Sequence, residues 1–512
     1  MSTINVSVKW NGKKFDNLTL DLDESPLMFK SQLFSITGVD PSRQKILIKG
    51  GTLKDDTDLK QLNLKDGHAF MMLGTAGELP KAPEKKVVFM EDMSDTQLQK
   101  AYDIPGGLQN LGNTCYMNAT LQCLRAIPEL QTGLKQFPGG INQANPSANL
   151  TASLRDLYRD LNENPDGYPP IIFLQKFRML FPKFSETDSR SGTYRQQDAE
   201  ECWTEMLTVL RDNLEAPNVS GGSEGPQATG DAATSSSSAA LSSTPGGMGS
   251  MVNRYLAGMV ETITQCAENP DEPPTTKHDP FYKLSCHIGK ETNYLAQGLR
   301  DSMTEEIEKQ SPSLGRNAKY VRTSKIVRLP SYLTVGFVRF YWKISEKMEA
   351  KILRKVQYPM TLDLVDFCRP DLQEKLRPAR DWVFKRENDK VEQQRQAKRN
   401  AAKGATEPTA MDQDSGATSS DANALELDPS FKNDPGADPS GLYDLCAVLT
   451  HIGRSSSSGH YIAWVRKQTT DDWFKFDDDT VSMVKTDDIK KLDGGGDWHT
   501  AYICLYRSKM LE

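Results

Sequence analysis

The sequence lacks a long apolar segment, an excess of basic residues and a leader-like start, and each absence removes a class of protein. Because no run of about 18 apolar residues occurs, no helix that crosses a membrane is predicted. Lysine and arginine total 62 against 69 aspartates and glutamates, and this net charge of −7 disfavours a nucleic-acid-binding protein, which needs a positive face. The start, MSTINVSVKW, has no basic head followed by an apolar run, so we expect a cytoplasmic and nuclear protein.

Cysteine is also scarce, with eight in 512 residues and no two of them three positions apart. A structural zinc site needs four converging ligands, commonly supplied as two Cys-x-x-Cys pairs, so we predict no metal ion and no other cofactor. Without a secretory signal the thiols should be reduced. Cys266, Cys286 and Cys368 are therefore predicted to be small buried apolar residues.

Three segments of biased composition divide the chain. Residues 76–103 combine prolines with a mixture of lysine and glutamate and are typical of a linker. Residues 216–250 are rich in glycine, serine, alanine and threonine, and about 386–438 begins as a charged helical run before turning acidic. Since strong core patterns flank the last two, we interpret them as disordered insertions within one domain, residues 104–510.

Residues 3–75 show the pattern of a small mixed domain. Apolar residues alternate before and after Asn11-Gly12, which predicts a hairpin. Ser25-Pro26 begins a segment of helical spacing that ends at Gly38. Two further strands are predicted, one at Ile46–Ile48 and one at Phe70–Leu73. The expected order is strand–strand–helix–strand–strand.

Cys115 stands where a helix is predicted to begin. The helical pattern starts at Thr114 and is limited by Pro128, and a glycine-rich loop precedes it. Unpaired N–H groups and the helix dipole at that end favour the thiolate, which is the nucleophilic form of cysteine. Most cysteines on helices are simply core residues, so a catalytic role requires a base elsewhere.

A candidate base follows near the C-terminus. His460 stands at the end of a Gly/Ser loop, residues 453–459, between two predicted strands. A third strand then ends in acidic residues, of which Asp477 could orient the imidazole and Asp478 is the adjacent alternative. The other nearby histidine, His451, is interpreted as a structural loop residue.

These segments resemble known families. The pattern of residues 3–75, including VDPSRQKILIKGGTLKDDTDLKQLNL, resembles the ubiquitin-like β-grasp fold, although the chain continues beyond Leu73 without a terminal Gly-Gly and so implies a docking module. GLQNLGNTCYMNATLQCL resembles the Cys box of the ubiquitin-specific proteases, and SSGHYIAWV with WFKFDDDTVS resembles their His box. QQDAEEC, at 196–202, resembles a third element of that family.

The resemblance implies an α+β chain: a β-grasp ubiquitin-like domain, and a papain-like catalytic domain built as fingers, palm and thumb. It implies Cys115 as nucleophile, His460 as base and then acid, Asp477 as orienting carboxylate and Asn110 as oxyanion donor. It also implies that four residues contact the substrate, whose arginine-containing tail suits carboxylates: Gln197, Asp198, Glu201 and Tyr461.

The combination of domains is similar to family members that associate with the proteasome. It implies a thiol-dependent deubiquitinase that acts on polyubiquitinated proteins at the 26S proteasome regulatory particle, binds it through the ubiquitin-like domain and releases ubiquitin for recycling. Loop 453–459 and the segment 337–351 would cover the substrate groove until docking, although the aromatic part of the latter could equally be a core strand. Two alternatives remain, a non-catalytic ubiquitin or proteasome adaptor and a protease for other ubiquitin-like proteins.

Overall fold

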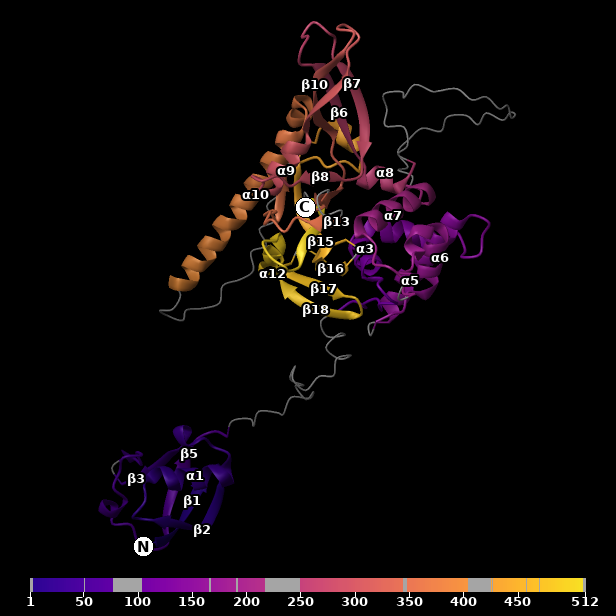
Figure 1. The fold of residues 1–512 in the computed structure, drawn as a ribbon. Helices are drawn as coiled ribbons and strands as arrows, with labels where there is room; N and C mark the ends of the chain where they lie inside the picture. The colour runs from indigo at the N-terminus through magenta and orange to yellow at the C-terminus, as the bar shows by residue number, and fades with distance from the viewer. Residues whose placement is uncertain are drawn as a thin grey trace, which may run out of the picture. The chain divides into compact units, whose positions relative to one another are not determined.

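The computed structural model describes two compact units, Met1–Met93 and Ser94–Glu512, which are treated separately below (Figure 1). The described residues are 3–49, 51–76, 104–164, 167–189, 192–216, 249–343, 348–403, 425, 427–456, 458–468 and 470–509. Among these residues no helix combines the length and the apolar character that a bilayer-spanning helix needs.

The N-terminal unit is one five-stranded sheet covered by a helix. Its elements are β1 (Thr3–Trp10), β2 (Lys13–Asp21), α1 (Pro26–Thr37), β3 (Lys45–Ile48), β4 (Gly51–Thr52) and β5 (His68–Leu73). The strand order is β2-β1-β5-β3-β4, with β1 and β5 parallel. Asn11 and Gly12 both have positive φ, which confirms the predicted hairpin turn.

The β-grasp prediction is confirmed, with one addition. Helix α1 ends as expected at Gly38, whose φ of 69° suits a residue without a Cβ. The two-residue strand β4 was not predicted, because Gly51-Thr52 has no alternating apolar pattern and pairs only through its backbone with Leu47 and Ile48.

The C-terminal unit begins with a helical layer, which we call the thumb (Figure 1). Its helices are α3 (Cys115–Arg125), α4 (Pro128–Gln136), α5 (Pro146–Glu163), α6 (Ile171–Leu180), α7 (Ala199–Asn213) and α8 (Met251–Leu256). Asn145 caps α5 and Asp198 caps α7, each by accepting backbone N–H groups of the first turn. The thumb core includes Tyr116 stacked on Phe184 and the fully buried Trp203.

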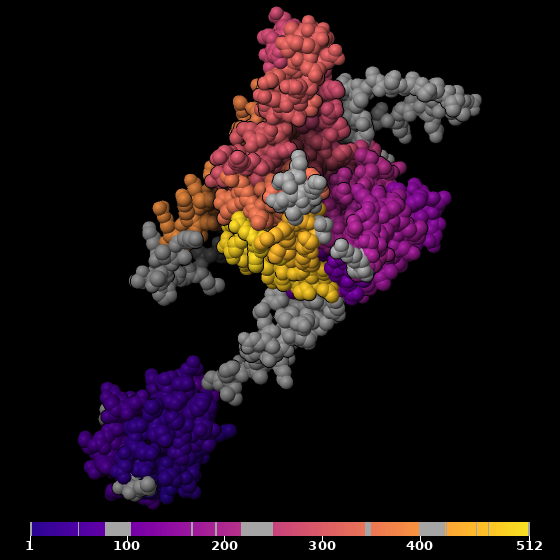
Figure 2. Space-filling model, viewed as in Figure 1, coloured from indigo at the N-terminus to yellow at the C-terminus, as the bar shows by residue number. Residues whose placement is uncertain are grey.

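An eight-stranded sheet, the palm, lies against the thumb, and Figure 2 shows the two packed side by side. Seven strands follow the order β18-β17-β16-β15-β19-β11-β8, and β14 pairs with β15. Their bounds are β8 (Leu284–His287), β11 (Tyr332–Val338), β14 (Thr361–Asp363), β15 (Leu442–Ser455), β16 (Ser458–Arg466), β17 (Asp472–Asp477), β18 (Thr480–Lys485) and β19 (Thr500–Ser508). Helix α3 packs on β16, and α9 (Leu295–Ser302) packs on β8.

A four-stranded sheet projects from the palm as the fingers (Figure 1). Its order is β7-β6-β10-β9, with bounds β6 (Gly258–Cys266), β7 (Thr275–Phe281), β9 (Thr304–Gln310) and β10 (Asn317–Arg328). Here Cys266 packs with Ala318 and Tyr320, while Glu272 accepts hydrogen bonds from Tyr320 and two serines. Cys266, Cys286 and Cys368 are all buried, as predicted.

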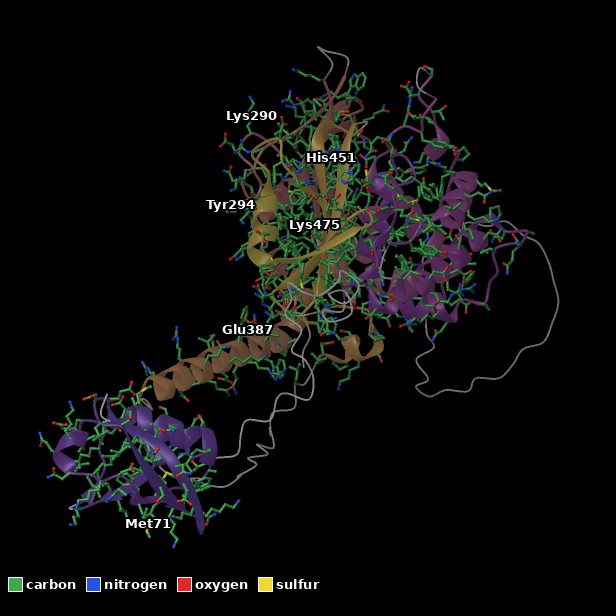
Figure 3. The ribbon with its side chains drawn as sticks, turned by 90° about the horizontal axis from the view of Figure 1, so that it is seen from below. Met71, Lys290, Tyr294, Glu387, His451 and Lys475 are labelled. Carbon is green, nitrogen blue, oxygen red and sulfur yellow. The ribbon has the colours of Figure 1, made fainter. Side chains whose placement is uncertain are left out.

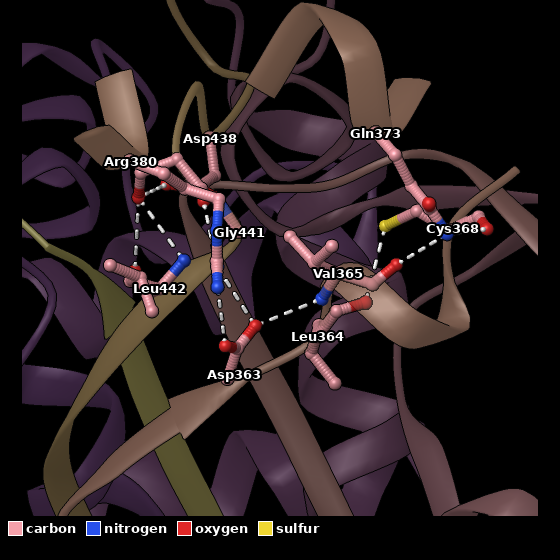
Figure 4. Close-up of polar contacts among 10 residues, drawn as sticks. Asp363, Leu364, Val365, Cys368, Gln373, Arg380, Asp438, Gly441 and Leu442 are labelled. Carbon is pink, nitrogen blue, oxygen red and sulfur yellow. Dashed lines mark hydrogen bonds and ion pairs between the residues drawn. The ribbon is translucent and has the colours of Figure 1, made fainter. Parts of the chain in front are cut away.

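Helix α10 (Pro370–Lys403) leaves the palm as a long rod (Figure 1). Its base is held by Arg380, which forms a bidentate ion pair with Asp363 at 2.6 and 2.9 Å (Figure 4). Next to this pair the fully buried Asp438 accepts hydrogen bonds from Ser440, Ser508 and the backbone of Gly441. The predicted insertion at 386–438 therefore begins as an extension of α10, and its end belongs to the folded palm.

The structure adds to or changes the sequence-based expectation for the segments 216–250, 453–459 and 337–351. The ends of the 216–250 segment meet, because Glu215 and Ser250 form a β-bridge, while residues 217–248 lie outside the described residues. The expected loop 453–459 is largely strand, because β15 and β16 continue to a Ser455–Ser458 pair, and His451 lies within β15 rather than in a loop.

The segment 337–351 also has two parts. Phe337 is a buried residue of β11, whereas the hairpin of β12 (Phe340–Lys343) and β13 (Met348–Lys351) exposes Tyr341 and Trp342. The core-strand interpretation is confirmed for Phe337, while the covering of the substrate groove by the rest of the segment stays a prediction.

Candidate active site

The thiol of Cys115 lies at the N-terminal end of α3, as the sequence predicts. Thr114 is the N-cap residue, and Cys115 is the first residue with helical geometry. The residue is buried, with 2% of its surface exposed. A nucleophile in this position faces the unpaired N–H groups of the first turn.

His460 extends from β16 and forms a hydrogen-bonded pair with Asp477 at the end of β17. Its Nε2 lies 2.7 Å from Oδ1 of Asp477, which leaves Nδ1 for the thiol. Hydrogen bonds first with Asp477 and then with Cys115 raise the pKa of His460 to about 10, and the partnership with His460 lowers that of Asp477. The geometry therefore favours an imidazolium next to the sulfur at neutral pH.

Two glycines allow the strands to approach this closely. A Cβ on Gly107 would lie 2.6 Å from the carbonyl oxygens of Asp478 and Asp479. Gly459 has a φ of 131°, and a Cβ there would lie 2.6 Å from Nε2 of His451. A side chain at Gly107 would collide with the backbone that follows β17, and one at Gly459 would collide with His451 of the neighbouring strand β15.

Asp478, the alternative orienting carboxylate, holds the loop that precedes Cys115. Its Oδ2 accepts from Nδ2 of Asn110 at 2.9 Å, and its Oδ1 accepts from Nδ2 of Asn118 at 2.8 Å. Its backbone oxygen accepts from Leu108 N–H at 2.9 Å. Asp477 and Asp478 thus have different partners: Asp477 contacts the base, and Asp478 contacts the predicted oxyanion donor.

The amide of Asn110 is oriented at both ends. Its Oδ1 accepts from the N–H groups of Gly112 and Thr114, so Nδ2 must be the atom that faces Asp478. One N–H of that group bonds Asp478, and the role of the second N–H as an oxyanion donor stays a prediction.

Gln196 is a site residue that the sequence analysis did not single out. Its Nε2 donates to Sγ of Cys115 at 3.1 Å, and the residue as a whole is 9% exposed. The predicted Gln197 instead turns away and donates to the carbonyl of Lys183. Both residues lie in the same QQDAEEC motif, and no spacing rule distinguishes their directions in an extended segment before a helix.

An acidic cavity of about 410 Å³ lies beside this segment. Asp198 and Glu201 line it together with Glu200 and Glu205, and Lys183 lies 3.6 Å from Glu201 and 3.3 Å from Glu205. Asp198 is also committed elsewhere, because it caps α7 and accepts from the hydroxyl of Tyr502 at 2.8 Å. The cavity suits a cationic ligand.

Tyr461 and His451 occupy the interior of the palm. The ring of Tyr461 is fully buried against His451, with the centroids 4.6 Å apart, so it packs inside the palm and does not line the acidic cavity. Burial, followed by the charge of Lys351, lowers the pKa of His451 to about 3, so this imidazole is neutral. Among the described residues no cluster of three or more Cys, His, Asp or Glu side chains could hold a metal ion.

Comparison with known proteins identifies the family. The family model for ubiquitin carboxyl-terminal hydrolase matches residues 106–506, and the ubiquitin family model matches residues 4–77. The chain belongs to the ubiquitin carboxyl-terminal hydrolase family. It is 40% identical to ubiquitin carboxyl-terminal hydrolase 6 of Arabidopsis thaliana, over 99% of both chains, and 40% identical to hydrolase 6 of Schizosaccharomyces pombe, over 99% of both chains. Hydrolase 14 of Caenorhabditis elegans is 32% identical over 99% of this chain and 94% of the relative.

The hydrolase is a cysteine-type deubiquitinase, and the geometry of Cys115, His460 and Asp477 fits the roles predicted for them in that chemistry. With Cys115 as the nucleophile, its thiolate would attack the carbonyl carbon of the scissile bond, and the oxyanion would form at the N-terminus of α3, where Asn110 is the predicted side-chain donor. The His460 imidazolium donates its proton to the leaving amine, which yields a thioester on Cys115.

Acylation then changes the base. The thioester cannot sustain the hydrogen bond and charge of Cys115, which are two of the causes of the high pKa of His460. The imidazole therefore loses its proton more readily in the acyl-enzyme, where it must take a proton from the attacking water. Collapse of the second tetrahedral intermediate releases the carboxylate and the free thiol.

Proposed function

We propose that this deubiquitinase removes ubiquitin from conjugates held at the 26S proteasome in the cytoplasm and nucleus, and so returns ubiquitin for reuse. The observation that carries the proposal is the pairing of a ubiquitin-like domain with the catalytic domain in one chain. That pairing extends over the full length of the relatives at 40% identity. The ubiquitin-like domain carries none of the predicted catalytic residues, so we infer that it serves to bind a partner.

The ubiquitin-like domain has a surface suited to docking. Leu47, Met71 and Leu73 are 39–53% exposed on one face of β3 and β5, and Leu47 is paired with Met71 across the strands. Figure 3 labels Met71 on this domain. Lys9 and Lys45 are their neighbours in the sheet. An exposed apolar patch with a basic rim fits a protein partner whose own surface is apolar and acidic.

The hairpin β12–β13 supports the proposal that docking raises activity. Phe340 at its start packs on Tyr502, with centroids 5.2 Å apart, and Tyr502 contacts Asp198 in the acidic cavity. Lys351 at its end donates to the carbonyl of His451 at 2.6 Å. The hairpin is thus anchored beside the predicted tail groove, where a shift would change access to Cys115.

Hydrolysis of a ubiquitin C-terminal fluorophore with and without purified proteasome tests the proposal. We expect a low basal rate, a rate at least about tenfold higher with proteasome, and no hydrolysis by Cys115→Ala.

Met71→Asp should weaken proteasome binding and activation. Leu27→Asp serves as the matched control, because Leu27 is an equally exposed apolar residue on α1. Full activity without proteasome would disprove the activation, and ubiquitin binding without hydrolysis would favour the adaptor. Parallel assays with ubiquitin-like proteins define substrate choice.

A further inference from the structure

A second cavity, of about 390 Å³, lies away from the acidic one where the thumb meets the palm. Its lining includes three cations, Arg125, Arg466 and Lys467, and four side-chain amides, but no carboxylate among the described residues that form it. The chain as a whole has a net charge of −7, so its overall composition does not account for this group of three cations.

The Arg125 guanidinium is the central feature of this cavity. It donates to Asn162 Oδ1 at 2.5 Å and to Gln122 Oε1 at 3.5 Å, and both of these partners are neutral amides. It forms no ion pair with a carboxylate of the described chain, and burial lowers its pKa. A half-buried cation has lost part of its hydration, and neutral amides replace that hydration only in part. Binding of an anion would therefore stabilise the guanidinium.

The second arginine comes from the palm. Arg466 ends β16, and its Nε donates to the carbonyl of Thr470 at 2.7 Å, which leaves the other nitrogens of the guanidinium without a partner in the described residues. Ile104, Pro105 and Val465 supply part of the apolar lining. A guanidinium fork beside an apolar wall suits a ligand with a phosphoryl group and an organic part.

The position of this cavity relies on the elements that also build the active site. Helix α3 begins at Cys115 and ends at Arg125, and β16 carries both His460 and Arg466. Strand β17, which ends at Asp477, contributes two phenylalanines to the lining. A ligand there would contact all three elements that carry Cys115, His460 and Asp477.

We propose that this cavity is a binding site for a small organic phosphate of nucleotide size, held by Arg125 and Arg466 with its organic part on the Ile104–Val465 wall. Its volume lies at the lower end of the range of small-molecule sites. Inorganic phosphate would fill only a fraction of it and would leave the apolar wall uncovered.

Calorimetric titration of the full chain, without ubiquitin, tests the site with ADP, glucose 6-phosphate, inositol hexakisphosphate, adenosine and inorganic phosphate. We expect one-to-one binding of at least one organic phosphate, and weaker binding by about tenfold or more for Arg125→Gln and Arg466→Gln. Arg159→Gln is the matched control, because its exposed guanidinium pairs with Asp156 and Asp160 outside this cavity, and it should bind as the wild type does.

Each other outcome would overturn the proposal. The first is that no organic phosphate binds. The second is that inorganic phosphate or adenosine binds as tightly as the organic phosphates. The third is that Arg159→Gln weakens binding as much as Arg125→Gln and Arg466→Gln do. If Arg125 serves only the last turn of α3, Arg125→Gln will lower the unfolding temperature and leave binding unchanged. Arg466→Gln provides the second test, since it removes only one bond to a loop carbonyl and should fold. Because no assay uses ubiquitin, a failure here is independent of the proposed proteasome function.

Discussion

Asp477 and Asp438 are two carboxylates of the same palm whose surroundings differ in charge and in burial. Asp477 has the cations His460 and Lys475 at 2.7 and 2.9 Å, and its pKa is lowered, chiefly by the bond with His460. Asp438 has only hydroxyl and backbone donors in a fully buried position, and burial raises its pKa to about 6. At Asp438 the hydrogen bonds do not offset full desolvation, whereas Asp477 is 34% exposed, has less desolvation to offset and has two cations beside it.

The two carboxylates therefore have opposite effects on stability as pH changes. The lowered pKa of Asp477 contributes stability above the pKa of the unfolded chain, and that contribution is lost as pH falls. Asp438 keeps its proton in the folded state up to about pH 6, while the unfolded chain releases it near 3.8. The folded state thus binds more protons between these values, and Asp438 lowers the free energy of unfolding as pH rises through them.

The largest expected effect comes from removing the charge of Asp477. Asp477→Asn should lower kcat/KM by roughly 10³-fold, because the imidazole loses both its orientation and its main source of positive charge. The alkaline limb of the pH–rate profile, expected near pH 10 in the wild type, should move to lower pH. A profile measured with the ubiquitin fluorophore over pH 6–11 gives both values, and an unmoved limb would contradict the assignment.

Asp438→Asn should have the next largest effect, on stability rather than on activity. The wild type should lose roughly 3 kcal/mol of unfolding free energy between about pH 4 and 6 from this group. The variant should lack that part of the slope. Urea titrations at several pH values measure it, with the exposed Asp471→Asn as the control that should retain the wild-type slope.

Asp478→Asn separates the neighbouring carboxylate from Asp477. An amide cannot accept from both Asn110 and Asn118, so the oxyanion donor loses its fixed orientation, and kcat should fall by about 10- to 100-fold with little change in KM. The alkaline limb should move less than in Asp477→Asn, since Asp478 is only a minor cause of the high pKa of His460. Equal limb shifts in the two variants would show that both aspartates act on the base.

Lys475→Met should give the smallest change. Its pair with Asp477 is partly exposed, with side-chain exposures of 27% and 34%, and such pairs contribute about 1 kcal/mol or less. We expect kcat/KM within about threefold of the wild type. A much larger loss would mean that Lys475, and not His460, determines the state of Asp477.

The sequence allowed prediction of the features that depend on contiguous residues. The Asn11-Gly12 turn, the Gly38 end of α1 and the start of α3 at Cys115 each follow from local conformational preferences. His460 and Asp477 were found because each stands at the end of a strand next to a glycine or acidic turn.

The features that were missed depend on packing between distant segments. Gln196 reaches Cys115 only after α3 and the segment before α7 pack together within the thumb. Asp478 reaches Asn110 and Asn118 only after a palm strand and the thumb loop are brought together. The extension of β15 and β16 to Ser455 and Ser458 relies on cross-strand backbone pairing, which a Gly/Ser composition does not reveal. The sequence predicts the helical run before Lys403. It does not predict that the chain is folded again at Asp438, which is buried in the palm.

The bridge between Glu215 and Ser250 has a consequence for how this chain can change over evolution. The backbone N–H of Ala216 also bonds the carbonyl of Gly249, so α7 and α8 are joined at a closed neck whatever lies between them. Sequence entering at that neck adds length without adding a constraint on the thumb. The position is a natural port for gaining, losing or grafting a whole module, because any insert with closely spaced ends leaves the catalytic scaffold intact.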